Sequence, residues 1–210
     1  MDIVAWFIDI VLHLDVHLVE LLRSYGLWVY LILFGIVFAE TGFVVTPFLP
    51  GDSLLFAAGA LAAVDTSGTL SAPLLSLLLV IAAVTGNTTN YHIGRWIGPP
   101  AFSGRYRWLK IDYLRRTEQF FAKYGSMTIV LSRFVPIIRT CAPFVAGVAR
   151  MPYARFQGYN LLGGAGWVLA FIWAGYFFGN LAVIRNNFGL VTIGIIVISL
   201  VPVAWVALRK

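Results

Sequence analysis

The sequence predicts an all-α, polytopic membrane protein organised as a single domain over residues 1–210. Hydrophobic residues make up 60% of the chain and charged residues only 11%, with a mean hydropathy of +0.87. This composition excludes an ordinary soluble domain. The net charge of +6 resides in short loops between apolar runs, as the positive-inside rule describes. We therefore expect a membrane as the partner, and no nucleic acid.

Residues 3–22 carry apolar side chains at three- and four-residue steps, interrupted by acids, which predicts an amphipathic helix in the membrane interface. His13 and His17 are four residues apart, but no third ligand is near, so no metal site is predicted. Cys141 is the only cysteine, which excludes an intramolecular disulfide. It is expected to be a small packing residue.

The apolar stretch 27–64 is broken by two acids, Glu40 and Asp52, together with prolines and glycines. The run that resumes at Leu54 and ends at Val64 is about 16 Å long as a helix, too short to cross a bilayer. These features predict a re-entrant hairpin with both acids near its bend. The hairpin would leave the acidic N-terminus outside, whereas full crossing by residues 27–42, the alternative, would place it inside.

Residues 74–98 are long enough to span, and they contain a polar cluster from Gly86 to His92 that must face the bundle interior or the interface. Residues 99–126 form a basic loop, in which Tyr113–Tyr124 has helical amphipathicity. The excess of Lys and Arg predicts that this loop lies on the cytoplasmic side.

The segment from Met127 to Val148 is apolar except for Arg133 and Arg139, and it includes Pro136 and Pro143. An arginine at the bilayer centre costs about 2.5 to 3.5 kcal/mol, so each needs a partner, a ligand or a watery cavity. Both prolines are expected to break the helix, since each removes a backbone donor. The segment therefore predicts a second re-entrant hairpin that presents two cations to an anion.

Residues 156–180 span next, with Asn160 and several glycines for close helix approach. Residues 188–208 form a final spanning helix that ends in Arg209 and Lys210, which places the C-terminus on the basic, cytoplasmic side.

Short matching motifs divide the chain into two repeats, about 1–98 and about 105–182, followed by the extra helix at about 188–208. The matched pairs are Tyr25-Gly26 with Tyr124-Gly125, Ala58-Gly59-Ala60 with Ala146-Gly147-Val148, and Gly94-x-x-x-Gly98 with Gly175-x-x-x-Gly179. Each repeat contains an interfacial helix, a re-entrant hairpin and one spanning helix. Because one span per repeat inverts the second repeat, the hairpins enter from opposite faces and can build a site at the midplane, as in secondary transporters.

The charges suggest a mechanism in which Arg133 and Arg139 bind a phosphate headgroup, since guanidinium groups suit phosphate oxygens. Glu40 and Asp52 would exchange protons, and a protonated acid would free an arginine for the anion. Supporting roles fall to Pro47, Pro50, Gly51, Pro136, Pro143 and Asn160. No catalytic residue, metal or other cofactor is predicted. The alternative is a buried charge network that only holds the hairpins together.

The pattern resembles the DedA family, also called the SNARE-associated or VTT-domain family, over nearly the whole chain. The motifs that carry the resemblance are Glu40-Thr41-Gly42, Pro47-Phe48-Leu49-Pro50-Gly51-Asp52, Ser132-Arg133-Phe134-Val135-Pro136, Arg139-Thr140, Pro143, Ala146-Gly147, Met151, Phe156, Asn160, Gly163 and Trp167. The resemblance implies lipid transport in a bacterial inner membrane, including recycling of undecaprenyl phosphate, phospholipid scrambling and dependence on the proton motive force. It also implies that the functional charges are Glu40, Asp52, Arg133 and Arg139. Asn87 stands where many relatives have aspartate, which argues against proton carriage at that position.

We therefore expect a lipid transporter, not an enzyme, that moves a phospholipid or polyprenyl phosphate and is driven by protons. The alternatives are an uncoupled scramblase, an ion or proton antiporter, and an intramembrane enzyme acting on lipid phosphates through Glu40 and Asp52. A homo-oligomer is left open, because small-residue faces can pack helices within or between subunits.

Overall fold

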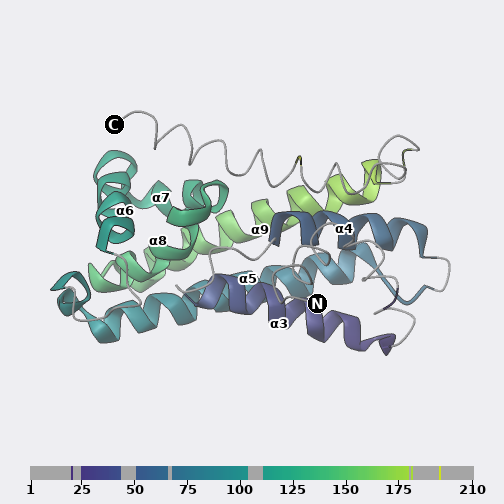
Figure 1. Cartoon of the computed structure of the whole chain (residues 1–210), viewed down its shortest axis with the longest axis horizontal. Coiled ribbons are helices and arrows are strands. Elements are labelled where there is room, and N and C mark those ends of the chain that lie inside the picture. The colour runs from purple at the N-terminus through teal and green to yellow at the C-terminus, as the bar shows by residue number, and fades with distance from the viewer. Residues whose placement is uncertain are drawn as a thin grey trace, which may run out of the picture.

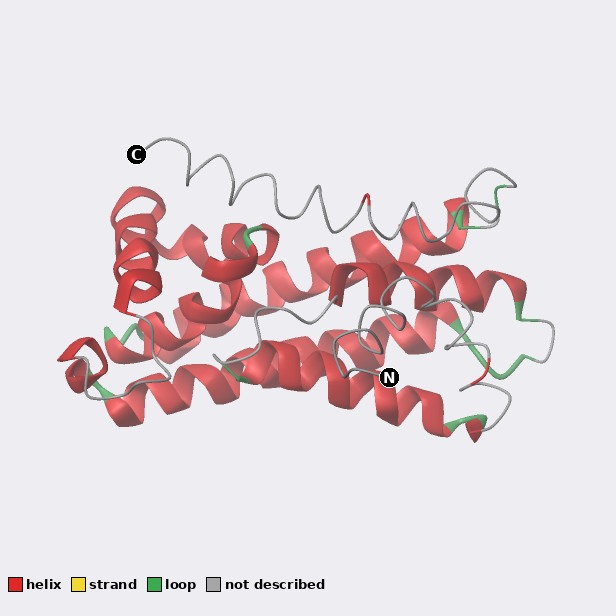
Figure 2. Ribbon diagram, viewed as in Figure 1, coloured by secondary structure: helices red, strands yellow, loops and turns green. Residues whose placement is uncertain are grey.

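The structure is a computed structural model that describes residues 20, 25–43, 51–65, 68–103, 111–179, 181 and 194. Within these residues the chain is helical, and it contains no strand (Figure 2). The α-helices are α3 (Trp28–Gly42), α4 (Gly51–Val64), α5 (Ala72–Ile97), α6 (Ile111–Tyr124), α7 (Thr128–Leu131), α8 (Pro136–Val148) and α9 (Tyr153–Phe178). Short 3₁₀ helices are η1 (Pro99–Ser103), η2 (Gly125–Met127) and η3 (Ser132–Phe134).

Helices α5 and α9 are the two in the described part that are long and apolar enough to cross a membrane. Each has 26 residues, roughly 39 Å of helix, against about 30 Å of hydrocarbon in a bilayer. They run antiparallel along the length of the molecule (Figure 1). Large apolar side chains on both are exposed, namely Leu74, Leu77, Ile81, Leu161, Leu162, Leu169 and Phe177. An apolar surface of this kind suits contact with lipid. The two predicted spans, 74–98 and 156–180, are confirmed as helices to within three residues at each end.

Helices α3, α4 and α8 are apolar but have only 15, 14 and 13 residues. At 1.5 Å per residue they are about 20 to 22 Å long, which is too short to cross the hydrocarbon core. Side chains from α3, α4, α5 and α9 form one buried apolar cluster, which includes Leu33, Leu55, Leu75 and Ile172. Helices α3 and α4 are thus covered by protein on the faces that contribute to this cluster, and α8 packs on α5.

The break in the second apolar segment lies at Pro136, where α8 begins. Val135 is extended, at φ −125° and ψ 100°, because a residue before proline avoids the helical region. The prediction that Pro143 also breaks the helix is wrong, since Pro143 lies inside the continuous helix α8. Proline lacks the N–H of one helical hydrogen bond, but α8 packs against α5 and α6 and its backbone stays helical.

Helices α4 and α9 meet backbone to backbone through two glycines. A Cβ atom on Gly59 would overlap the carbonyl oxygen of Ile172, and one on Gly175 would overlap the carbonyl oxygen of Phe56. Each helix therefore contributes one glycine and one carbonyl to the crossing. No larger residue fits at either glycine without moving the neighbouring backbone.

Helices α5 and α8 cross in the same reciprocal way at the other end of the molecule (Figure 1). A Cβ atom on Gly94 would overlap the carbonyl oxygen of Phe144, and one on Gly147 would overlap that of Tyr91. These glycines belong to the matched motifs from which the sequence repeat was predicted.

The predicted amphipathic helix in the basic loop is confirmed as α6, which packs on α8. Gly125 ends it with φ +57°, and Gly26 has φ +52° just before α3. Both glycines adopt a left-handed conformation that side chains disfavour. Apart from the single residues 20 and 194, the predicted helices at 3–22 and 188–208 lie outside the described residues, as do Pro47 and Pro50.

Candidate functional site

Arg139 joins three helices in the interior of the bundle. From the first turn of α8, its Nη1 donates a 2.7 Å hydrogen bond to Oδ1 of Asp52 in α4, and its Nη2 donates to Oε1 of Glu40 in α3. The side chains are 6%, 13% and 1% exposed for Arg139, Asp52 and Glu40. The structure therefore brings three of the four predicted charges into one buried ion cluster. Oε2 of Glu40 has no hydrogen-bond partner there.

Trp167 of α9 completes this cluster, although sequence reasoning did not select it as a site residue. Its Nε1 donates a 2.8 Å hydrogen bond to Oδ1 of Asp52, and the side chain is fully buried. The guanidinium carbons of Arg139 and Arg133 lie 5.2 and 5.7 Å from its ring centroid. These distances allow cation–π attraction to both arginines. The sequence feature that could have identified Trp167 is its indole N–H group, which needs a hydrogen-bond acceptor when it lies in an apolar span.

Arg133 differs from Arg139, because no carboxylate among the described residues pairs with it. It lies in η3 and is 1% exposed. Its Nη2 donates to Oδ1 of Asn160 at 2.9 Å and to the carbonyl of Ala83 at 3.3 Å. Its Nε and Nη1 are buried without a hydrogen-bond partner in the described structure. Both predicted acids therefore bond to Arg139, whereas Arg133 bonds to an amide and a carbonyl.

Asn160 connects Arg133 to both long helices. Its Oδ1 also accepts a 3.0 Å hydrogen bond from Asn87 of α5, and its Nδ2 donates to the carbonyl of Val84 at 3.0 Å. Gly164, one turn further along α9, leaves the space for the arginine, because a Cβ atom there would lie 3.3 Å from Nη2 of Arg133. Asn160 thus binds one guanidinium nitrogen, Nη2, and makes no hydrogen bond to the buried Nε and Nη1.

Two further residues shape the site. Asn90 of α5 is fully buried, and its Nδ2 donates to the carbonyls of Thr41 at 3.3 Å and Thr140 at 2.8 Å, which ties α3 and α8 to α5. Sequence reasoning missed it within the polar cluster 86–92. Gly51, predicted as supporting, lies against the Glu40 carboxylate, and a Cβ atom there would overlap it.

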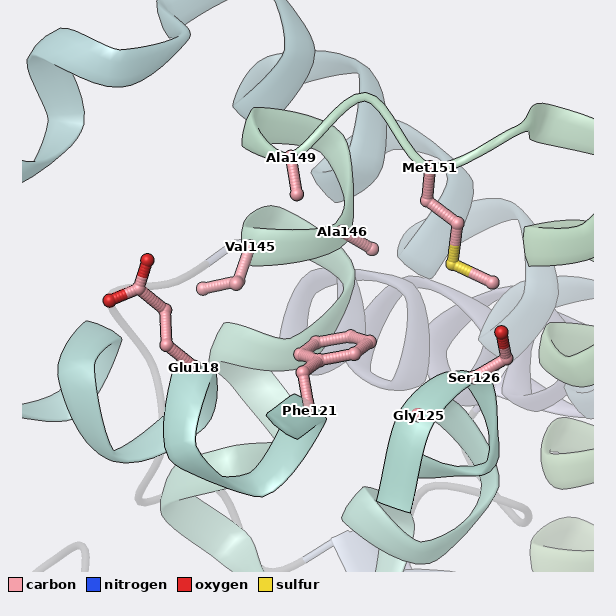
Figure 3. Close-up of a pocket in the computed structure, with 8 residues that line it drawn as sticks. All are labelled: Glu118, Phe121, Gly125, Ser126, Val145, Ala146, Ala149 and Met151. Atoms are coloured by element: carbon pink, nitrogen blue, oxygen red, sulfur yellow. The ribbon is translucent and has the colours of Figure 1, made fainter. Parts of the chain in front are cut away.

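The structure also contains a cavity of about 400 Å³ between α6, η2 and the C-terminal end of α8 (Figure 3). The lining residues are Glu118, Phe121, Gly125, Ser126, Val145, Ala146, Ala149 and Met151. The cavity is mostly apolar and contains none of the predicted site residues. The described residues include no group of three or more His, Cys, Asp or Glu side chains that could hold a metal ion.

Two apolar helices of spanning length, three helices too short to span and a buried cluster of charges define a helical membrane protein with a polar site inside its bundle. The family model of the VTT domain matches residues 49–177. The chain belongs to the VTT-domain family, also called the DedA family, as the sequence motifs predicted.

The chain is 52% identical to the protein named DedA of Escherichia coli (strain K12) over 203 residues, covering 96% of this chain and 92% of that one. It is 42% identical over 168 residues to an uncharacterized membrane protein of Mycobacterium tuberculosis (strain ATCC 25618 / H37Rv), covering 80% and 73% of the two chains. It is 37% identical over 152 residues to the inner membrane protein YqjA of Escherichia coli (strain K12), covering 72% and 68%. No solved structure matches the chain.

Proposed function

We propose that this protein is a lipid transporter that carries the phosphate headgroup of a phospholipid or polyprenyl phosphate through the bundle while the lipid tail stays in the bilayer. The observation that carries the proposal is Arg133, a buried cation with two nitrogens, Nε and Nη1, that lack an acceptor among the described residues. An isolated buried charge is costly. A phosphate group would supply both the countercharge and the missing acceptors.

Arg139 supports a second part of the proposal, which is coupling to protons. In the observed state both of its terminal nitrogens bond to carboxylates, so it is not available to an anion. Protonation of Glu40 or Asp52 would remove one of these charges and release part of the guanidinium. Oε2 of Glu40 can accept a proton without displacing a hydrogen bond. Phosphate and carboxylate would then compete for Arg139, and proton entry would favour phosphate.

We also propose that α3 with α4, and η2 to α8, are re-entrant hairpins of two inverted repeats. The short lengths of α3, α4 and α8 support this arrangement. The reciprocal glycine crossings support it as well, because the second half of each hairpin packs on the long helix of the other repeat. The basic end of the bundle would face the cytoplasm of a bacterium, by the positive-inside rule.

The test is translocation of labelled lipid in proteoliposomes, with and without an imposed pH gradient. We expect the wild type to move a phospholipid or a polyprenyl phosphate faster than empty vesicles do, and faster still with the gradient. The variant Arg133→Gln should abolish this movement while remaining folded, as judged by circular dichroism and gel filtration. Arg139→Gln should also abolish it, and because this variant loses the cation of the ion cluster, it is assayed only in preparations that pass the same two checks.

Other outcomes identify the alternatives. Equal rates with and without a gradient would indicate a scramblase, and proton flux without lipid movement an antiporter. Release of inorganic phosphate would indicate an enzyme. If a folded Arg139→Gln variant retained full transport, the ion cluster would have only a structural role.

A further inference from the structure

A continuous polar face connects the exposed end of α9 with the buried Arg133. Tyr153, Gln157 and Asn160 lie four and three residues apart along one side of α9. Nε2 of Gln157 donates to the hydroxyl of Tyr153 at 2.6 Å, and its Oε1 accepts from Asn160 at 3.0 Å. Asn160 in turn bonds to Arg133 at 2.9 Å. Tyr153 is 43% exposed and Asn160 is fully buried, so the face leads from the surface to the interior.

Helix α5 supplies the opposite wall of this face. Oγ1 of Thr88 accepts a 2.8 Å hydrogen bond from Gln157, and one turn earlier Thr85 is exposed. One turn later His92 is exposed, with its ring 5.4 Å from the ring of Tyr153. The polar groups therefore come from both long helices and meet between them.

The position of this face in a membrane protein calls for an explanation. Polar side chains inside a bilayer are costly and usually face a site or a watery path. The outer faces of the same helices carry exposed leucines such as Leu77 and Leu162, as a lipid-facing surface should. The polar face also begins at the basic end of the bundle, where Arg95, Arg150 and Arg155 are exposed. These cations would concentrate anions at its mouth.

The chemistry of the face favours an anion over a proton or a metal cation. Between Tyr153 and Arg133 it contains amides and hydroxyls but no carboxylate among the described residues. Amide and guanidinium N–H groups donate hydrogen bonds to phosphate oxygens, but they do not relay protons as carboxylates do. The face ends at the two unpartnered nitrogens of Arg133, Nε and Nη1.

We propose that the α5–α9 polar face is the access path by which a phosphate group reaches Arg133, and that Gln157 is a specificity-determining residue along it. The identity of the cargo rests on the proposed function, whereas the path itself can be tested separately. The phosphate passes from the exposed mouth to Gln157, and then from Gln157 to the pair formed by Asn160 and Arg133. Helices α5 and α9 need to part only locally, since the tail remains outside.

The test is thiol accessibility in a Cys141→Ala background, which is practical because Cys141 is the only cysteine and is 2% exposed. Gln157→Cys reports on the path. Leu162→Cys, on the same helix and 60% exposed towards the predicted lipid side, is the control. The proteins are labelled in dodecyl maltoside, which contains no phosphate, with a hydrophilic methanethiosulfonate. Because a hydrated cysteine thiolate attacks the sulfur of this reagent and displaces methanesulfinate, Gln157→Cys should react about tenfold faster than Leu162→Cys.

Two phosphate probes then separate the possible cargoes. Dihexanoyl phosphatidate and inorganic phosphate are added in separate arms, and at least the lipid should slow labelling of Gln157→Cys several-fold. Adding Arg133→Gln should abolish this protection, measured as the ratio of the labelling rates with and without probe in that same variant. Protection by the lipid alone indicates a lipid headgroup, and equal protection by both probes indicates free phosphate. Both results support the path.

Three results would overturn the path: equal labelling of the two cysteines, no protection by either probe, or protection that persists with Arg133→Gln. The second result would indicate a water-filled path for protons. Separately, Gln157→Glu should raise the apparent KM for the transported lipid with little change in kcat, because its charge repels phosphate at the mouth. If the wild type transports lipid but Gln157→Cys does not react with the methanethiosulfonate, the proposed access path is wrong and the proposed function stands. If the wild type moves no lipid but phosphate probes slow the labelling of Gln157→Cys, the proposed function is wrong and the access path stands.

Discussion

Replacement of Arg139 by glutamine should destabilise the protein strongly, because it leaves two carboxylates without their cation. The substitution removes two charge-assisted hydrogen bonds, to Asp52 and to Glu40, and both acceptors are largely buried. Removal of one partner from a buried ion pair costs about 3 to 5 kcal/mol, because the remaining charge stays desolvated. The second carboxylate at this site places the expected loss at the upper end of that range.

The double variant Glu40→Gln/Arg139→Gln separates this cause from general disruption. It leaves one buried carboxylate that has lost its bond to Arg139 in place of two, so it should be more stable than Arg139→Gln alone. The free energy of unfolding can be measured in mixed micelles of dodecyl maltoside and SDS for the wild type, both single variants and the double variant. Contacting residues typically couple by about 0.5 to 3 kcal/mol, and we expect a value in this range. Additive losses would refute the reasoning.

Arg133→Gln is the matched control for the same measurement. Arg133 has no carboxylate partner among the described residues, and a glutamine can still bond to Asn160. Loss of an unpaired buried charge offsets the lost contacts, so we expect stability to change by about 1 kcal/mol or less while transport is lost. A loss as large as that of Arg139→Gln would mean that Arg133 is a structural residue.

The other predictions concern packing. Gly175→Ala places a Cβ against the carbonyl oxygen of Phe56 and should cost about 1 to 3 kcal/mol by overpacking. Gly158→Ala, in open space on the same helix, should be neutral or gain up to about 1 kcal/mol, and equal losses would refute the close crossing. Tyr91→Phe leaves the carbonyl of Met151 without its 2.5 Å hydrogen bond, and should cost about 1 kcal/mol in the same micelle titration. An unchanged midpoint would show that this carbonyl finds another donor.

The long helices were predictable because apolar length alone determines them. The basic amphipathic helix α6 was predictable for a similar reason, since its charged and apolar residues separate at helical spacing. The prediction that Pro143 breaks the helix was wrong, because it used the local rule that proline interrupts helices, and here tertiary packing determines the backbone conformation. A proline removes one bond from α8, but the dense crossing of α8 with α5 holds the remaining backbone in helix.

The four charges of the site were predictable because charges in an apolar segment are costly and therefore conspicuous. Their pairing was not, since it depends on which elements approach one another in space. Asp52 and Glu40 both turned out to contact Arg139, and Arg133 was left to an amide. Trp167 was noted only as a motif residue and Asn90 only as part of a polar cluster, because neither is unusual in a membrane helix until its acceptor is known.

The two glycine crossings also constrain how the molecule can change shape. Where backbones touch directly, no side chain can rotate to let one helix slide past the other. We therefore expect α4 with α9, and α5 with α8, to behave as two rigid bodies. Asp52 belongs to the first body and Arg139 to the second, so their hydrogen bond connects the two bodies. Glu40, on α3, lies with the second body, because Gly42 packs directly on Gly86 of α5. Of the two acids, Asp52 is therefore the one whose protonation weakens a bond between the two bodies, which the α5–α9 bonds of Asn160 and Gln157 also join.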